Sequence, residues 1–175
     1  MILPLFRKTS RTDQVFAVYN AIVAQSRRST FYAGWSVPDT LTGRFDVLSL
    51  HLSLVLRRLR SDEKHARGFA QELLDLFFKD MDRSLREMGV GDLSVPKRIK
   101  KMGNLFYGLL NAVTQALDAG DNQALQDVLG RNIYDEAPPE ALEALATYVD
   151  AAAAALAAQP LEGILAGKLE FQSLN

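Results

Sequence analysis

The chain has 175 residues, a hydrophobic fraction of 48%, a charged fraction of 23% and a net charge of −1, which are values typical of a globular protein with its own core. It contains no cysteine, and this excludes disulfides, thiolate metal sites and cysteine nucleophiles. In the first residues, MILPLFRKTSR, the apolar run precedes the positive charges, the reverse of a secretory signal. We therefore expect one domain over residues 1–175, located in the cytoplasm.

Charge is unevenly distributed along the chain. Residues 1–117 carry 18 Lys/Arg against 11 Asp/Glu, whereas residues 118–175 carry 2 against 10. The basic part could face an anionic partner, or the acidic C-terminal part could simply pack beside it. The most lipid-like stretch, VDAAAAALAA from Val149, is about half the length that spans a bilayer, so no transmembrane segment is expected.

The apolar spacing predicts helices along nearly the whole chain. A first helix begins at Thr12 and Asp13, which are favourable N-cap residues, and ends in SRRST. An aromatic loop, FYAGWSVPDTLTGRFD, follows, with Pro38 and Gly43 as helix breakers. Further helices are predicted over residues 45–60, 61–88, 96–117, 122–130 and 140–159. The predicted fold class is all-α: a single-domain bundle of about six helices with an irregular C-terminal tail.

The second predicted helix has apolar residues on two sides. Opposite its core face lies a stripe of Val47, Leu50 and Leu54, which is flanked by His51, Arg57 and Arg58. A helix that is apolar all round is typically buried at the centre of a protein. The alternative is that the stripe forms an exposed apolar patch for a client or partner. His51 is expected to be a packed or capping residue rather than a ligand.

The fourth predicted helix begins at Pro96, and its first turns carry Lys97, Arg98, Lys100 and Lys101. Proline is favoured in the first turn of a helix. Cations in that turn oppose the helix dipole, at a cost of about 0.3–1 kcal/mol each when exposed. We interpret the four cations as a binding site for an anionic partner, with Arg57 and Arg58 as additional members. The alternative is that they only solvate the helix end.

Along the same helix, a broad apolar arc faces away from a polar stripe. The stripe contains Lys97, Lys101, Asn104, Gly108 and Asn111. Asn104 and Gly108 are small enough to allow a partner to approach closely, and we include both in the candidate site. The alternative is a core helix whose glycines accommodate a neighbouring helix. The apolar arc comprises Ile99, Met102, Phe106, Leu109, Leu110, Val113 and Leu117.

Signatures of catalysis or metal binding are absent from the sequence. The only histidines are His51 and His65, and the segment DEKH supplies a single D-x-x-H where a di-iron bundle needs a pair of such motifs. The G-V-G of MGVGDLS follows a predicted helix rather than a strand and lacks the rest of a nucleotide-binding loop. We predict no catalytic, cofactor-binding or metal-binding residues, and a protein that is not an enzyme.

Four segments of the chain carry a family pattern: VPDTLTGRFDVLSLHLSLVLRRL, FFKDMDRSLREMGVGDLSVPKRIKKM, FYG and RNIY. They resemble the ubiquinol–cytochrome c chaperone family, whose members are assembly factors for the cytochrome bc complex of mitochondria and alphaproteobacteria. The resemblance is strongest over residues 31–134. In that family FYG is followed by Arg, whereas here Leu109 follows Gly108, so a polar role at that position is not carried over and Leu109 is interpreted as packing.

This resemblance implies a non-catalytic chaperone that binds newly made cytochrome b and assists assembly of ubiquinol–cytochrome c reductase. It also implies a bacterial-type member, for which a ribosome or an anionic membrane surface is a further candidate partner. DNA and a small-molecule substrate are not expected. The alternative function is a peripheral RNA- or anionic-lipid-binding protein without a specific client. An enzyme acting on quinone or haem is a third, less favoured candidate.

Overall fold

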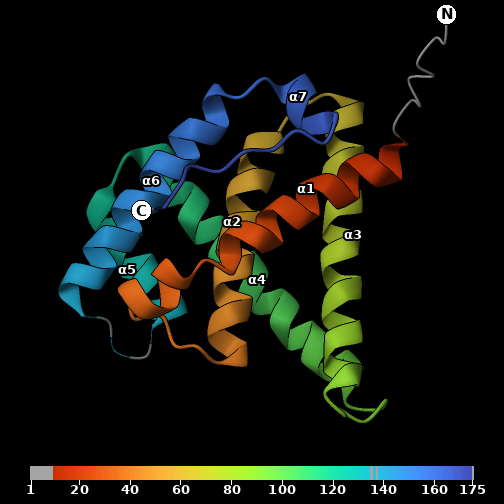
Figure 1. Ribbon diagram of the computed structural model, residues 1–175, viewed down its shortest axis with the longest axis horizontal. Coiled ribbons are helices and arrows are strands. Elements are labelled where there is room, and N and C mark those ends of the chain that lie inside the picture. Colours follow the sequence, from red (N-terminus) through yellow and green to blue (C-terminus); the bar gives the residue numbers. More distant parts are fainter. Residues whose placement is uncertain (1–9, 135, 137, 175) are drawn as a thin grey trace, which may run out of the picture.

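Helices make up most of the part of the chain that the computed structural model describes, residues 10–134, 136 and 138–174, and no strand occurs there (Figure 1). The predicted all-α fold class is confirmed. The elements are α1 (Arg11–Ser26), a π-helical turn η1 (Thr30–Gly34), α2 (Leu41–Leu59), α3 (Lys64–Glu87), α4 (Val95–Ala119), α5 (Asn122–Ile133), α6 (Pro139–Ala158) and α7 (Leu161–Leu165).

Helix α2 is the central element of the bundle. It contacts α1, α3, α4, α5 and α6, so both of its apolar sides pack against other helices. Val47 and Leu50 are 0% exposed and Leu54 is 2% exposed. The interpretation of these three residues as an exposed patch for a client or partner is therefore wrong, and the interpretation of this helix as centrally buried is confirmed.

Helix α2 also begins four residues earlier than predicted. The Thr40 hydroxyl caps it by accepting a hydrogen bond from the Gly43 N–H at 3.1 Å. Gly43 therefore does not break the helix but lies in its first turn. A Cβ there would stand 2.0 Å from the carbonyl oxygen of Pro38, so the close approach of the preceding loop requires glycine. The N-cap of α1 is Ser10, two residues before the predicted Thr12, and Ser10 forms a capping box with Asp13.

The C-terminal region is more ordered than the predicted irregular tail. Residues 161–165 form α7, and its Ile164 and Leu165 are buried. By length and composition, α6 is the one helix in the described part that could cross a membrane. The whole helix meets that criterion, not only the shorter alanine-rich segment. Its buried Leu145 and Val149 join the core, as in the core helix of a bundle.

A polar network crosses the core between α1, α2 and α6. His51 Nδ1 lies 2.7 Å from the carbonyl oxygen of Val47, which can only accept, so Nδ1 carries the proton. His51 Nε2 is then the acceptor for the Tyr148 hydroxyl at 2.8 Å. That hydroxyl in turn accepts a hydrogen bond from Gln25 at 3.0 Å. The prediction that His51 is a packed residue is confirmed.

Candidate functional site

The four predicted cations stand exposed on the first turns of α4. Helix α4 has no acidic residue in its first turn and has Pro96 there. Lys97, Arg98, Lys100 and Lys101 are exposed, and none lies within ion-pair distance of an acid among the residues that the structure describes. The repulsion by the helix dipole is therefore not offset by a described acid of the chain. We call these four residues the basic cluster.

Acids lie near the basic cluster, but they bind to arginines of α3 instead. Arg86 bridges Asp82 at 2.7 Å and Asp92 at 2.5 Å. Arg83 pairs with Asp80 at 2.5 Å. The hydrogen bond from Arg86 lowers the pKa of Asp82. The acids close in sequence to the α3–α4 connection are thus paired with arginines of α3 and not with the basic cluster.

Arg57 and Arg58 are engaged within the chain and do not belong to the basic cluster. Arg57 Nη2 lies 2.8 Å from Asp118 Oδ1 at the end of α4. Arg58 donates to the carbonyl oxygens of Leu156 at 2.9 Å and Gln159 at 2.7 Å, so it caps the C-terminal end of α6. Their inclusion in the anion-binding site is corrected, because both guanidinium groups already have intramolecular partners.

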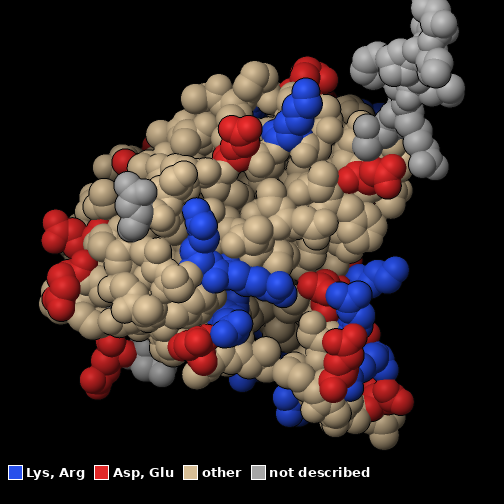
Figure 2. Space-filling view, in the orientation of Figure 1, with Lys and Arg blue, Asp and Glu red and all other residues tan. Residues whose placement is uncertain are grey.

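The charge asymmetry could also reflect packing of the acidic C-terminal part beside the basic part, and this explanation applies to only one acid. Among the described residues after 117, Asp118 alone forms ion pairs with the basic part, with Arg57 and with Arg60 at 3.1 Å. Figure 2 shows other acidic side chains spread along the edge formed by α5 and α6. Packing between the two parts therefore explains Arg57 and Arg60 but leaves the basic cluster unneutralised by the described acids.

Beyond the basic cluster, the polar stripe of α4 faces outward as predicted. Asn104, Gly108 and Asn111 are exposed. A Cβ added at Gly108 would meet nothing within 4 Å, whereas one at Gly103 would contact the Phe78 ring at 3.7 Å. Gly103 thus accommodates a neighbouring helix, and Gly108 leaves an open place on the outer surface.

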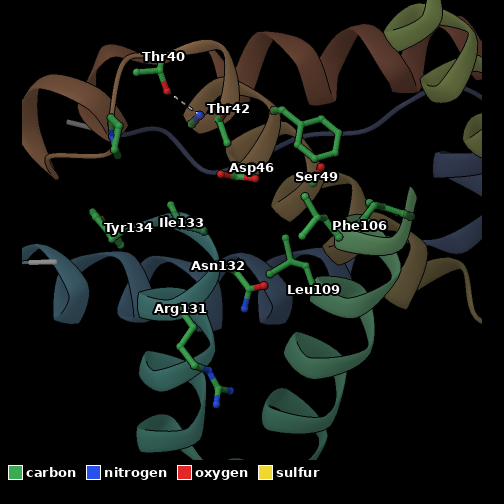
Figure 3. A pocket seen from close by; sticks show the side chains of 14 residues that line it. Thr40, Thr42, Asp46, Ser49, Phe106, Leu109, Arg131, Asn132, Ile133 and Tyr134 are labelled. Atoms are coloured by element: carbon green, nitrogen blue, oxygen red, sulfur yellow. Dashed lines mark hydrogen bonds between the residues drawn. The ribbon is translucent and has the colours of Figure 1, made fainter. Parts of the chain in front are cut away.

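A hollow of about 460 Å³ lies on one side of this stripe, between α4, the first turns of α2 and the end of α5 (Figure 3). Phe106 and Leu109 of α4 line it and are buried. Thr42 and Asp46 of α2 face Asn132 of α5 across it (Figure 3). The interpretation of Leu109 as a packing residue is confirmed, and part of its side chain forms the wall of this hollow.

A second hollow, of about 540 Å³, lies on the other side of the stripe. It is bounded by the end of α2, the first half of α3 and the middle of α4. Its apolar surface comes from Leu56, Leu74, Tyr107 and Leu110, and Arg60 and Arg67 are among its polar residues. The stripe with Gly108 is thus a ridge between two hollows, the first with a mixed polar and apolar lining and the second with a mainly apolar one.

Two residues of this surface, Leu105 and Tyr107, were missed by the sequence interpretation. They are 49% and 51% exposed and belong to the first and second hollow respectively. At 100° per residue they flank the polar stripe on its two sides, which is the signal that could have found them. They supply the accessible apolar surface that had been expected at Val47, Leu50 and Leu54.

A profile of the family described as ubiquinol-cytochrome C chaperone matches residues 34–171. The chain belongs to the ubiquinol–cytochrome c chaperone family. Family similarity extends well past Tyr134, where the resemblance in the sequence had been strongest. The extension covers α6 and α7, whose buried residues complete the core.

Two curated relatives are each named ubiquinol–cytochrome c reductase complex assembly factor 1. The proteins from Xenopus laevis and Mus musculus are 23% identical over 134 residues, which is 75% of this chain. The match spans 66% of the frog protein and 45% of the mouse protein. A crystal structure of the Cbp3 homolog from Brucella abortus superimposes with a TM-score of 0.85 and 43% identity, covering 99% of this chain and 97% of that one.

Proposed function

We propose that this chaperone-family protein binds newly made cytochrome b and holds it during assembly of ubiquinol–cytochrome c reductase, without catalysing a reaction. Family membership supports a role in assembly of the complex. The observation that carries the proposal for a binding surface is the outer face of α4. There an open ridge at Gly108 separates two hollows that each include apolar residues, and the basic cluster, which no described acid neutralises, lies at the head of the ridge.

Each part of this face matches a feature of a membrane-protein client. Transmembrane helices offer apolar side chains, and the two hollows can shield such side chains from water while the client awaits its partners. The absence of a side chain at Gly108 lets a helix backbone approach α4 closely. The basic cluster would face lipid phosphates or acidic loops near the membrane, so the protein would act at the cytoplasmic side of the inner membrane.

Deletion of the gene in the native host tests this function. We expect the content of assembled cytochrome bc complex, measured by b-type haem spectra of membranes, to fall specifically and to return with the wild-type gene. Normal spectra in the deletion strain would contradict the proposal. A Gly108→Leu variant should complement poorly, since a bulky side chain would block the ridge.

Changing the four cations of the basic cluster together to Gln should leave the fold intact and weaken association with the client at the membrane. The matched control replaces Lys64 and Lys79, which are exposed cations of α3 outside the proposed face, with Gln. Co-purification of cytochrome b with tagged protein measures association. A large loss of thermal stability with unaltered co-purification would refute this assignment of the cluster.

The second candidate function is a peripheral protein that binds RNA or anionic lipid without a specific client. The same basic cluster favours it, because attraction to phosphate needs no further recognition. Co-sedimentation with ribosomes and with liposomes across a salt series separates the candidates. Purely electrostatic capture disappears steeply as salt rises, whereas a client held in apolar hollows remains bound.

A further inference from the structure

The connection between α3 and α4 projects from the body of the protein as a narrow tip (Figure 1). Leu93, in this connection, is 98% exposed and is the most exposed large hydrophobic residue in the described part of the chain. Met88, at the end of α3, is 49% exposed. We call Met88–Ser94 the tip. An aliphatic side chain this exposed lacks any packing role within the chain.

The charges around the tip favour an anionic surface. Residues 80–101 carry six Lys/Arg against four Asp/Glu, a net charge of +2. The four acids are all paired with Arg83 or Arg86. The basic cluster, which begins four residues after Leu93, has no described acid within ion-pair distance. The unneutralised positive charge is therefore concentrated next to the exposed aliphatic side chains.

We propose that the tip is a membrane anchor: Leu93 and Met88 enter the headgroup and upper acyl region of an anionic bilayer, while Lys97, Arg98, Lys100 and Lys101 bind lipid phosphates. Apolar side chains beside cations are the combination by which peripheral proteins bind anionic bilayers. This inference deepens the peripheral-membrane part of the proposed function and is independent of which client is bound.

The chemistry of the tip favours a bilayer over single-stranded RNA. Proteins that hold unpaired bases combine cations with aromatic rings on which the bases stack. The segment Met88–Lys101 contains no aromatic residue, and its two exposed apolar side chains are aliphatic. Gly108 lies 15 residues after Leu93, about 20 Å farther along at the helical rise. An anchored tip would therefore leave the face of α4 free for a client.

Because the chain has no cysteine, a Leu93→Cys variant carries a single label at the tip. Its NBD derivative should gain intensity and shift to the blue with vesicles of phosphatidylcholine containing one third phosphatidylglycerol. Lipids brominated in the acyl chain should quench it. Vesicles of phosphatidylcholine alone should have little effect. The matched control is a label at Phe16→Cys, another exposed apolar position, on α1, which should not respond.

Unlabelled variants measure how much each part contributes to vesicle binding. Leu93→Gln should lower the partition coefficient about tenfold, since it removes one inserted aliphatic side chain. Changing the four cations of the basic cluster to Gln should lower the partition coefficient about 600-fold, as each cation near an anionic surface contributes about fivefold. Circular dichroism should show unchanged helix content, because all five positions are exposed.

Three results would overturn the anchor. One is sedimentation with anionic vesicles while the label at Leu93→Cys stays in water, which would indicate electrostatic contact alone. Another is that the protein binds ribosomes but not anionic vesicles. The last is that the protein binds neither ribosomes nor vesicles. None of these results bears on cytochrome bc content in the deletion strain, so failure of the anchor and failure of the chaperone function are distinguishable.

Discussion

His51 occupies the middle of α2 as a neutral imidazole. Burial lowers its pKa from about 6.5 to about 4, because the charged form would lose its hydration. Its two ring nitrogens already form hydrogen bonds with Val47 and Tyr148, and the imidazole and the Phe31 ring are in T-shaped contact with centroids 5.1 Å apart. The folded state thus favours the neutral form, whereas the unfolded chain accepts a proton below pH 6.5.

Stability should therefore fall as pH decreases from about 6.5 toward 4. The pKa of His51 is lower in the folded state than in the unfolded chain. Its contribution to the free energy of unfolding is therefore fully present above the pKa of the unfolded chain. Below that pH the contribution is lost, because the unfolded chain takes up a proton and the equilibrium moves toward unfolding. Between pH 7 and pH 5 we expect a loss of about 2 kcal/mol in the free energy of unfolding. Urea titrations at both pH values measure it. In His51→Gln most of this pH dependence should disappear; an equal loss in that variant would assign it to other groups.

At the scale of the helix, the sequence of α4 predicted which residues are buried and which are exposed, but it did not predict the hollows beside the helix. The alternation of apolar and polar faces placed Phe106 and Leu109 inside and Asn104 and Gly108 outside, because a one-sided pattern has a single stable orientation. The hollows beside α4 could not be predicted, since their walls come from α2, α3 and α5. The position of α2 could not be predicted for the same reason. Its two apolar sides are compatible with a buried central helix and with a helix that exposes one side, and only the neighbouring helices decide between them.

The partners of Arg57 and Arg58 show most clearly that contacts between distant parts of the chain could not be predicted from the sequence. Arg57 and Arg58 look like members of a basic surface because they are adjacent cations in the sequence. Asp118 lies 61 positions after Arg57, and the carbonyl oxygens of Leu156 and Gln159 belong to residues 98 and 101 positions after Arg58. Only the tertiary arrangement joins such groups. Lys97 and Lys101 have no described acid within ion-pair distance, so for them the sequence interpretation still stands as a prediction.

The two glycines of α4 permit a test of the outer face. Gly108→Ala should raise the free energy of unfolding by about 1 kcal/mol, since alanine favours a helix and the added methyl group meets no atom. The same variant should weaken association with the client, because the methyl group stands on the ridge between the hollows. Chemical unfolding and co-purification measure the two effects.

Gly103→Ala is the matched control within the same helix. Its methyl group would touch the Phe78 ring at an ordinary contact distance of 3.7 Å. We therefore expect a similar gain in stability without any loss of association. If both variants retained full association, the ridge would not be the contact surface. If both lost it, the effect would reflect the stiffness of α4 rather than access to its outer face.

In the whole molecule, one hydrophobic core joins residues from all seven helices of the described part. It includes Phe77 of α3 and Phe106 of α4, which are in ring contact with centroids 5.2 Å apart, and it extends to Leu145 and Ile164 near the C-terminal end. No helix has a separate core of its own. Domains that share a single core usually unfold cooperatively, so the chain is expected to behave as the single domain that its length predicted.

Equilibrium unfolding by urea should accordingly show one transition with coincident midpoints by two probes. Trp35 is the only tryptophan and packs against Phe31 and Tyr148, so its fluorescence reports on the region between η1 and α6. Far-UV circular dichroism reports on all helices together. A Trp35→Phe, Phe78→Trp variant moves the fluorescent probe to α3 and should give the same midpoint as its own circular dichroism. A fluorescence transition at lower urea than the transition by circular dichroism would mean that α3 and α4 unfold separately. The single-domain prediction would then fail for the segment that carries both the basic cluster and the tip.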